Sequence, residues 1–197
     1  MGSSIRGIAI SHVATKQYID GLAENGKWYD EHDDDHGNKH NMKQFGSALI
    51  QLRHYIEETT ILSLAKVMED LRYDARTMLD KKIKFTTPFT PPALYYKDLM
   101  SVYHLANVIK HNRSIIDRTS SPSSRELVDK YGFRDGDPIV SQEIDYISLI
   151  YKCYLSLSDI VGRFNGREAA EVPEDFTENL RWFYKLMIPP AIKSASV

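Results

Sequence analysis

The chain has 197 residues, of which 42% are hydrophobic and 26% are charged, and its formal net charge is −2. This length and composition indicate one helical or mixed globular domain over residues 1–197 and exclude a mostly disordered chain. The small net charge excludes a whole-protein attraction to nucleic acid or anionic membranes, and the single cysteine, Cys153, excludes an internal disulfide framework. No run approaches the ~18 to 20 apolar residues of a membrane span, so we expect no membrane anchor and a cytoplasmic location.

The N-terminal region carries weaker structural signals than the rest of the chain. Residues 11–22 predict a short helix, smaller than the helices that follow. Residues 26–42 are polar and contain Gly26 and Gly37, a composition that predicts an exposed and mobile loop.

The strongest helical signal lies in residues 47–82, which contain neither Gly nor Pro. If unbroken, this helix is roughly 50 Å long at the usual rise per residue. It therefore either kinks near Thr59 or forms the spine of an elongated bundle. The apolar residues recur at intervals of three and four, which is the pattern of one amphipathic helix: Leu49, Leu52, Ile56, Ile61, Leu64, Ala65, Met68, Leu71, Ala75, Met78 and Leu79.

A second long helix is predicted over residues 91–112, after a proline-rich connection. Thr90 is suited to cap its N-terminus, and Pro91 fits the first turn, where a missing N–H has no cost. Its apolar residues form a stripe for packing against other helices: Tyr95, Leu99, Val102, Ala106 and Ile109.

The C-terminal half predicts one loop and two more helices. Residues 117–138 lose periodicity, and residues 117–124 have the composition of a mobile loop. A third helix is expected from Ser141 to Val161, with apolar residues all round, and a fourth after Asp175. The sequence thus predicts an all-α protein, an elongated bundle of four main helices with a smaller N-terminal helix.

Residues that could carry chemistry gather at the end of the second long helix. At ~100° per residue, His104, Asn107 and His111 fall on one face, with Met100 among them and with the apolar stripe on the other side. This polar face is expected to line a cleft or to meet another subunit.

The same segment resembles the HEPN families of small helical-bundle proteins, which include ribonucleases of toxin–antitoxin, abortive-infection and other prokaryotic defence systems. Members carry on a late helix an Arg, a polar residue that is often Asn, three variable residues and a His. Asn107-Val-Ile-Lys-His111 matches the Asn and the His at that spacing, whereas Ala106 stands where an active member has its Arg.

The resemblance implies a HEPN-like bundle that cleaves RNA without a metal or cofactor, with two sites meeting across a homodimer. His111 would act as acid or base, and Asn107 would orient it or the phosphate, so these two are the catalytic candidates. Because the family's Arg is replaced, other cations would have to contact the phosphate. The substrate-binding candidates are His104, Lys110 and Arg113, and further charge could come from Arg118 or Arg53.

The same residues also have a structural interpretation. Lys110, His111 and Arg113 lie in or after the last turn of a helix, where each cation stabilises the carbonyl end by ~0.3 to 1 kcal/mol. Asn112 is suited to cap that end. On this interpretation the chain is a degenerate relative of the nucleases, with no turnover.

A second hypothesis of a different class is a non-catalytic interaction module. The second face of the 91–112 helix would then bind a partner protein or a second copy of the chain, because surfaces rich in Tyr and Met are typical of interfaces. That face carries Tyr96, Met100, Tyr103 and His104.

Two other features carry little functional signal. His32, His36 and His40 are interleaved with aspartates and could bind a divalent metal if helical, but Gly37 argues against a continuous helix, so no metal site is predicted. Cys153 lies in the apolar third helix and is expected to be a small core residue.

Overall fold

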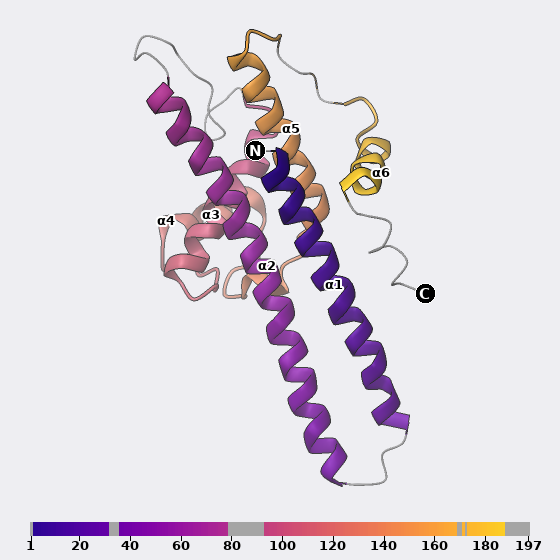
Figure 1. Ribbon diagram of the computed structural model, residues 1–197. Coiled ribbons are helices and arrows are strands. Elements are labelled where there is room, and N and C mark those ends of the chain that lie inside the picture. The colour runs from indigo at the N-terminus through magenta and orange to yellow at the C-terminus, as the bar shows by residue number, and fades with distance from the viewer. Residues whose placement is uncertain (1, 32–35, 79–92, 169–170, 172, 188–197) are drawn as a thin grey trace.

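The computed structural model of the protein describes residues 2–31, 36–78, 93–168, 171 and 173–187 (Figure 1). In these ranges the chain forms helices and their connections, and it contains no β-strand. One isolated antiparallel bridge joins Ile115 to Pro138. The predicted all-α class is confirmed.

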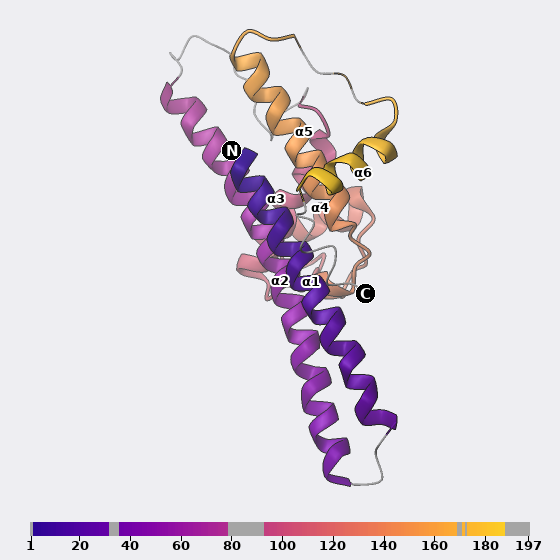
Figure 2. The same cartoon turned by 45° about the vertical axis from the view of Figure 1, so that its right-hand side comes forward.

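Two long helices of opposite direction form the spine of the molecule. α1 (Gly2–Glu31) and α2 (His36–Met78) lie side by side in both views and extend as an arm well beyond the other helices (Figures 1 and 2). α2 continues through Thr59 without interruption. Of the two predictions for this helix, the spine of an elongated bundle is therefore the one that the structure shows. Its 43 residues span roughly 65 Å at the usual helical rise.

The prediction for the N-terminal region was wrong in extent. α1 has 30 residues and is one of the two longest helices, not a smaller one. Residues 26–31 and 36–42, predicted as a polar loop, are helical, and residues 32–35 lie outside the described part of the chain. Glycines and polar residues lower intrinsic helix propensity, but propensity is a weak prior that pairing of two long helices overrides.

Four shorter helices gather beside the upper part of the spine (Figure 1). α4 packs against α3, α3 and α5 pack against α2, α5 also contacts α1, and α6 covers α5. A short 3-10 helix, η1 (Ile139–Ser141), precedes α5. The four helices are α3 (Tyr96–His111), α4 (Pro122–Tyr131), α5 (Tyr146–Phe164) and α6 (Phe176–Met187).

α4 lies in a stretch that the sequence analysis assigned to a loop. Ser121 caps it by accepting a hydrogen bond from the Ser124 backbone N–H at 3.1 Å, and Pro122 occupies the first turn. Gly132 ends it with a left-handed φ of 74°. Its ten residues give too short a periodic pattern to distinguish from a loop rich in serine, so the sequence did not reveal it.

The third predicted helix begins later than expected. Asp145, not Ser141, caps α5, because its carboxylate accepts a hydrogen bond from the Ser148 backbone N–H at 3.0 Å. Ser141 ends η1 instead. The predicted start of the last helix is confirmed, since α6 begins at Phe176, and Asp175 before it accepts a hydrogen bond from the Glu178 backbone N–H at 2.8 Å.

The core forms where the predicted stripes meet. In α2 the stripe is buried over its middle part, and in α3 burial is wider than predicted, because Leu105 and Val108 join the expected residues. Cys153 is fully buried, and burial raises the pKa of its thiol to about 12, as befits a core residue. The predicted stripe residues that are buried are Ile56, Ile61, Leu64, Ala65, Met68, Leu71, Leu99, Val102 and Ala106.

In the described ranges, no helix has the length and apolar character needed to cross a membrane.

Candidate functional site

Two of the predicted site residues, His104 and Asn107, pack against α4. His104 Nδ1 lies 3.3 Å from the Ser123 hydroxyl, and Asn107 Nδ2 donates a hydrogen bond to the same oxygen at 3.2 Å. Both side chains are half-buried. The polar face of α3 is therefore covered in part by its own chain. The contact with Ser123 was not predicted, because residues 117–124 have the composition of a loop.

The environment of His104 favours an uncharged imidazole. Its ring meets Tyr103 edge-on at 5.4 Å between centroids and lies 6.1 Å from the ring of Tyr131 on α4. Burial lowers the pKa of His104, and nearby Lys130 lowers it further, while Glu126 opposes both. At neutral pH the His104 ring is therefore mostly uncharged and offers no positive charge to a phosphate group.

Ala106, which the resemblance to HEPN proteins would align with their arginine, belongs to the core. Only 1% of its surface is exposed, and its neighbours Val102 and Leu105 on α3 are buried as well. The helical spacing predicted this burial. A charged side chain at position 106 would have to lie among apolar groups.

His111 and the cations beside it are exposed at the carbonyl end of α3. The His111 side chain makes no hydrogen bond to other described residues. Arg113 and Ser114 take left-handed backbone conformations, with φ of 53° and 62°, so Arg113 has left the helical register of Lys110 and His111. Of the predicted site residues, His104, Asn107 and His111 share one face of α3, at spacings of three and four, but only His104 and Asn107 contact α4.

Three cations considered as substitutes for the missing arginine each face a carboxylate. Lys110 Nζ lies 3.7 Å from Glu69 on α2, and Arg118 pairs with Asp129 at 3.0 Å. Arg53 pairs with Glu57 on α2 at 2.9 Å. The exposed pairs of Lys110 and Arg118 are weak, typically ~0.2 to 1 kcal/mol, so they lower the positive potential without fixing the side chains.

Asn112 ties the end of α3 to the start of α4. Its Nδ2 lies 2.7 Å from Ser120 Oγ, 2.9 Å from Ser121 Oγ and 3.0 Å from Ser124 Oγ. An amide nitrogen carries two hydrogens, so two of these bonds form at once. The role predicted for Asn112 at the helix end is confirmed, and it extends to holding the α3–α4 junction together.

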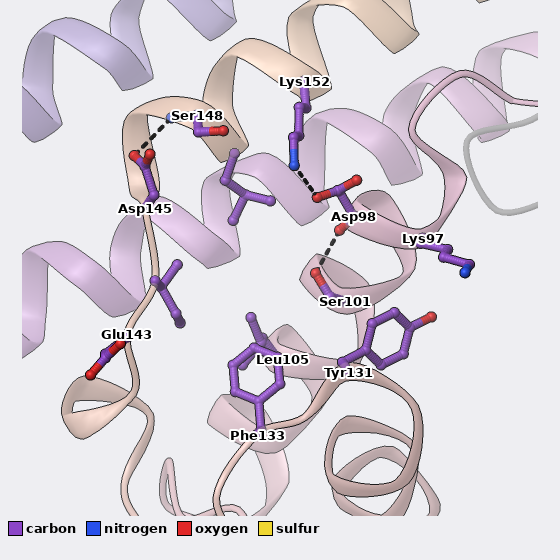
Figure 3. Close-up of a pocket in the computed structure, with 12 residues that line it drawn as sticks. Lys97, Asp98, Ser101, Leu105, Tyr131, Phe133, Glu143, Asp145, Ser148 and Lys152 are labelled. Atoms are coloured by element: carbon purple, nitrogen blue, oxygen red, sulfur yellow. Dashed lines mark hydrogen bonds and ion pairs between the residues drawn. The ribbon is translucent and has the colours of Figure 1, made fainter. Parts of the chain in front are cut away.

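A hollow of about 250 Å³ lies between α3 and the start of α5, and Figure 3 shows the side chains around it. Asp98 and Lys152 form an ion pair across it at 2.5 Å. The Ser101 hydroxyl donates to the Asp98 backbone carbonyl at 2.7 Å. These polar groups are already paired with one another, which suits a structural link between α3 and α5 better than a reaction site.

Metal ligation finds no support in the described part of the chain, where no three His, Cys, Asp or Glu side chains gather closely enough to hold an ion. The side chains of His32, His36 and His40 lie outside the described residues.

Comparison with known proteins leaves the chain without a match: no protein-family model, no curated protein and no solved structure resembles it significantly.

Proposed function

We propose that this protein is a degenerate relative of the HEPN-like ribonucleases, and that it acts as a helical-bundle module that binds a partner protein rather than as an enzyme. The defence or toxin–antitoxin setting of that family is part of the proposal and rests on the resemblance of Asn107-Val-Ile-Lys-His111 alone.

The burial of Ala106 is the observation that carries this proposal. An arginine that contacts a phosphate must reach solvent, and position 106 is 1% exposed in the core of the bundle. The arginine that would offset phosphate charge in an active member is replaced by Ala106. Because this position is buried, a cationic side chain introduced there would not reach RNA.

The contacts of His104 and Asn107 support the same conclusion. Both side chains hydrogen-bond to Ser123 on α4 and stabilise the α3–α4 contact. Polar groups satisfied within the chain are less available to a substrate, because binding would first have to break those bonds.

The competing nuclease hypothesis has one observation in its favour, the exposure of His111. An exposed imidazole could still transfer protons in RNA cleavage. The test is an RNA cleavage assay with labelled single-stranded RNA, run with and without EDTA on the wild type and on His111→Ala.

We expect no cleavage above the buffer control for either protein, and identical unfolding curves. Cleavage by the wild type in EDTA that falls ~10²-fold or more in His111→Ala would overturn the proposal in favour of a metal-independent ribonuclease. RNA binding without cleavage, seen by gel shift, would indicate that the binding partner is RNA rather than a protein.

A further inference from the structure

The last helix, α6, lies at the edge of the molecule, where it packs on α5 and α1 (Figures 1 and 2). Its inward side chains share one helix face at positions i, i+4 and i+7: Phe176, Leu180 and Phe183. Apolar anchors at this spacing are the pattern by which an amphipathic helix binds to another protein. α6 therefore shows, within one chain, what kind of segment the covered face of α5 accepts.

The face of α5 under α6 is aromatic. The Tyr151 ring contacts two anchors of α6, with centroids 5.4 Å from Phe176 and 4.8 Å from Phe183. Tyr154 lies 5.5 Å from Phe183. Lys152 Nζ lies 5.8 Å from the centre of the Phe176 ring, a distance at which a cation attracts an aromatic ring. This aromatic face, formed by Tyr151, Lys152 and Tyr154, thus favours aromatic side chains at the first and the last anchor position.

α6 is held in place by few side chains. Of its residues whose side chains the structure describes, Phe183 alone is buried, at 5% exposed, while Phe176, Leu180 and Tyr184 are half-buried. The others are exposed, and Trp182 reaches 55%. A helix of 12 residues is marginal without packing, so α6 is expected to open more easily than the helices of the core.

α5 does not depend on α6 for its place in the bundle. A separate face of α5 packs into the core, with Ile150, Cys153, Leu157 and Ile160 at most 2% exposed. That face meets α1, α2 and α3. When α6 opens, α5 therefore stays in place, and its aromatic face becomes available to another helix.

Tyr95, next to this face, is a strained residue. Its ring meets Phe176 of α6 edge-on at 6.0 Å between centroids, and its φ of 53° is an uncommon, left-handed conformation for a bulky side chain. Its hydroxyl is buried and has no hydrogen-bond partner among the described residues. Such strain persists only where the surrounding packing holds it, and it gathers at ligand-binding and switch regions. The strain at Tyr95 thus favours a contact with α6 that changes in function.

We propose that the aromatic face of α5 is the surface that binds the partner protein, and that α6 covers it until an amphipathic helix of the partner takes its place. The incoming helix carries an aromatic, an aliphatic and an aromatic side chain at positions i, i+4 and i+7, as α6 does. This inference rests on the proposed function, which supplies the protein partner. The two can fail separately, because RNA cleavage involves His111 and helix exchange involves α5 and α6.

A fluorescein-labelled peptide with the sequence of residues 173–187 serves as the probe helix. It is titrated into the full-length wild type and into full-length Phe183→Ala, and binding is followed by fluorescence anisotropy. Because the substitution removes the buried anchor of the tethered helix, we expect the peptide to bind this variant at least about tenfold more tightly than the wild type. Trp182→Ala is the matched control, since it shortens an exposed side chain of the same helix and should leave peptide binding as in the wild type.

Three results of this titration would overturn the proposal. The first is binding to Phe183→Ala that is no tighter than binding to Trp182→Ala. The second is equal binding of a peptide that carries both Phe176→Ala and Phe183→Ala. The third is a wild-type dimer that dissociates in full-length Phe183→Ala, because it would assign the aromatic face to the α6 of a second copy.

Hydrogen exchange of the wild type tests the opening of α6 without any substitution. We expect the amides of α6 to exchange at least about 10²-fold faster than those in the middle of α5, because α6 opens locally. Equal protection of the two helices would show that α6 opens only when the whole protein unfolds, and it would also overturn the proposal.

Discussion

Ala106 shows how one buried side chain limits what α3 can do. The proposed resemblance to HEPN proteins aligns it with the arginine of active members, and 1% of it is exposed. An arginine introduced at position 106 therefore tests packing and function together. If the protein stays stable, position 106 must open to solvent, and if the protein unfolds, position 106 must be closed in the core.

We predict that Ala106→Arg destabilises the protein by at least about 3 kcal/mol, because it buries an unpaired charge. Urea unfolding followed by circular dichroism measures the change. The control is His111→Arg, which places the same side chain at an exposed position of α3 and should alter stability by less than about 0.5 kcal/mol. An Ala106→Arg protein that is stable and cleaves RNA would contradict the burial argument.

We also predict that stability falls with acidification because of His12. Its pKa is lowered from 6.5 to about 4 in the folded protein, so between these values the unfolded chain binds more protons than the folded one. The contribution is complete above pH 6.5 and is lost as the pH falls towards 4, by up to about 3 kcal/mol.

Urea unfolding at pH 7 and at pH 4.5 measures this dependence in the wild type and in His12→Gln. The substitution removes the titrating ring, so the difference between the two pH values should shrink. Lys16, Arg53, Glu57 and Tyr146 line a cavity together with His12 and are unchanged in the variant, so their contributions cancel. An equal pH dependence in both proteins would show that His12 is protonated normally.

Between elements, side-chain hydrogen bonds from α3 hold the start of α4 in place. Asn112 donates to the serine hydroxyls at the start of α4, while His104 and Asn107 contact Ser123 further along it. α4 has only ten residues and would be marginal alone, so these bonds and its packing hold it in place.

We predict that Asn112→Ala destabilises the protein by about 1 to 2 kcal/mol, because the hydrogen bonds from this amide to the serine hydroxyls at the start of α4 are lost. Thermal unfolding measures the loss, and faster hydrogen exchange in α4 than in α5 would locate it. Asn165→Ala is the control, since Asn165 makes one exposed bond at the end of α5. Equal losses in the two variants would argue against a special role for Asn112.

For the molecule as a whole, the homodimer expected from the sequence stays a prediction. The face proposed for it, with Tyr96, Met100, Tyr103 and His104, is partly buried within one chain. Other large apolar side chains are more exposed and lie on α1, α2 and α6: Tyr18, Ile50, Tyr55, Tyr73 and Trp182.

We predict a dimer by light scattering at tens of micromolar and its loss in Tyr96→Asp, since a charge in an interface core opposes association. A dimer that persists in Tyr96→Asp would place the contact on another surface. A monomeric wild type would contradict the predicted homodimer but not the proposed complex with a different protein.

The sequence alone determined the helical class and the inward side of α2 and α3. Burial of Ile61, Leu64, Met68, Val102 and Ala106 follows from their spacing, because helical periodicity is a local property that any neighbour must respect. The same locality explains the correct assignment of Cys153 to the core.

Only the tertiary structure decided the extent of α1, the presence of α4 and the environment of the candidate site. Residues 26–31 and 36–42 read as a loop because their local propensity is low, and the pairing of α1 with α2 is a contact between segments that no local pattern records. The contact of Asn107 with Ser123 and the stacking of His12 on Tyr146 likewise join distant parts of the chain. Whether a polar side chain is hydrogen-bonded within the protein or free to bind a ligand depends on such distant partners. The sequence could therefore single out His104 and Asn107, but it could not show that both contact Ser123.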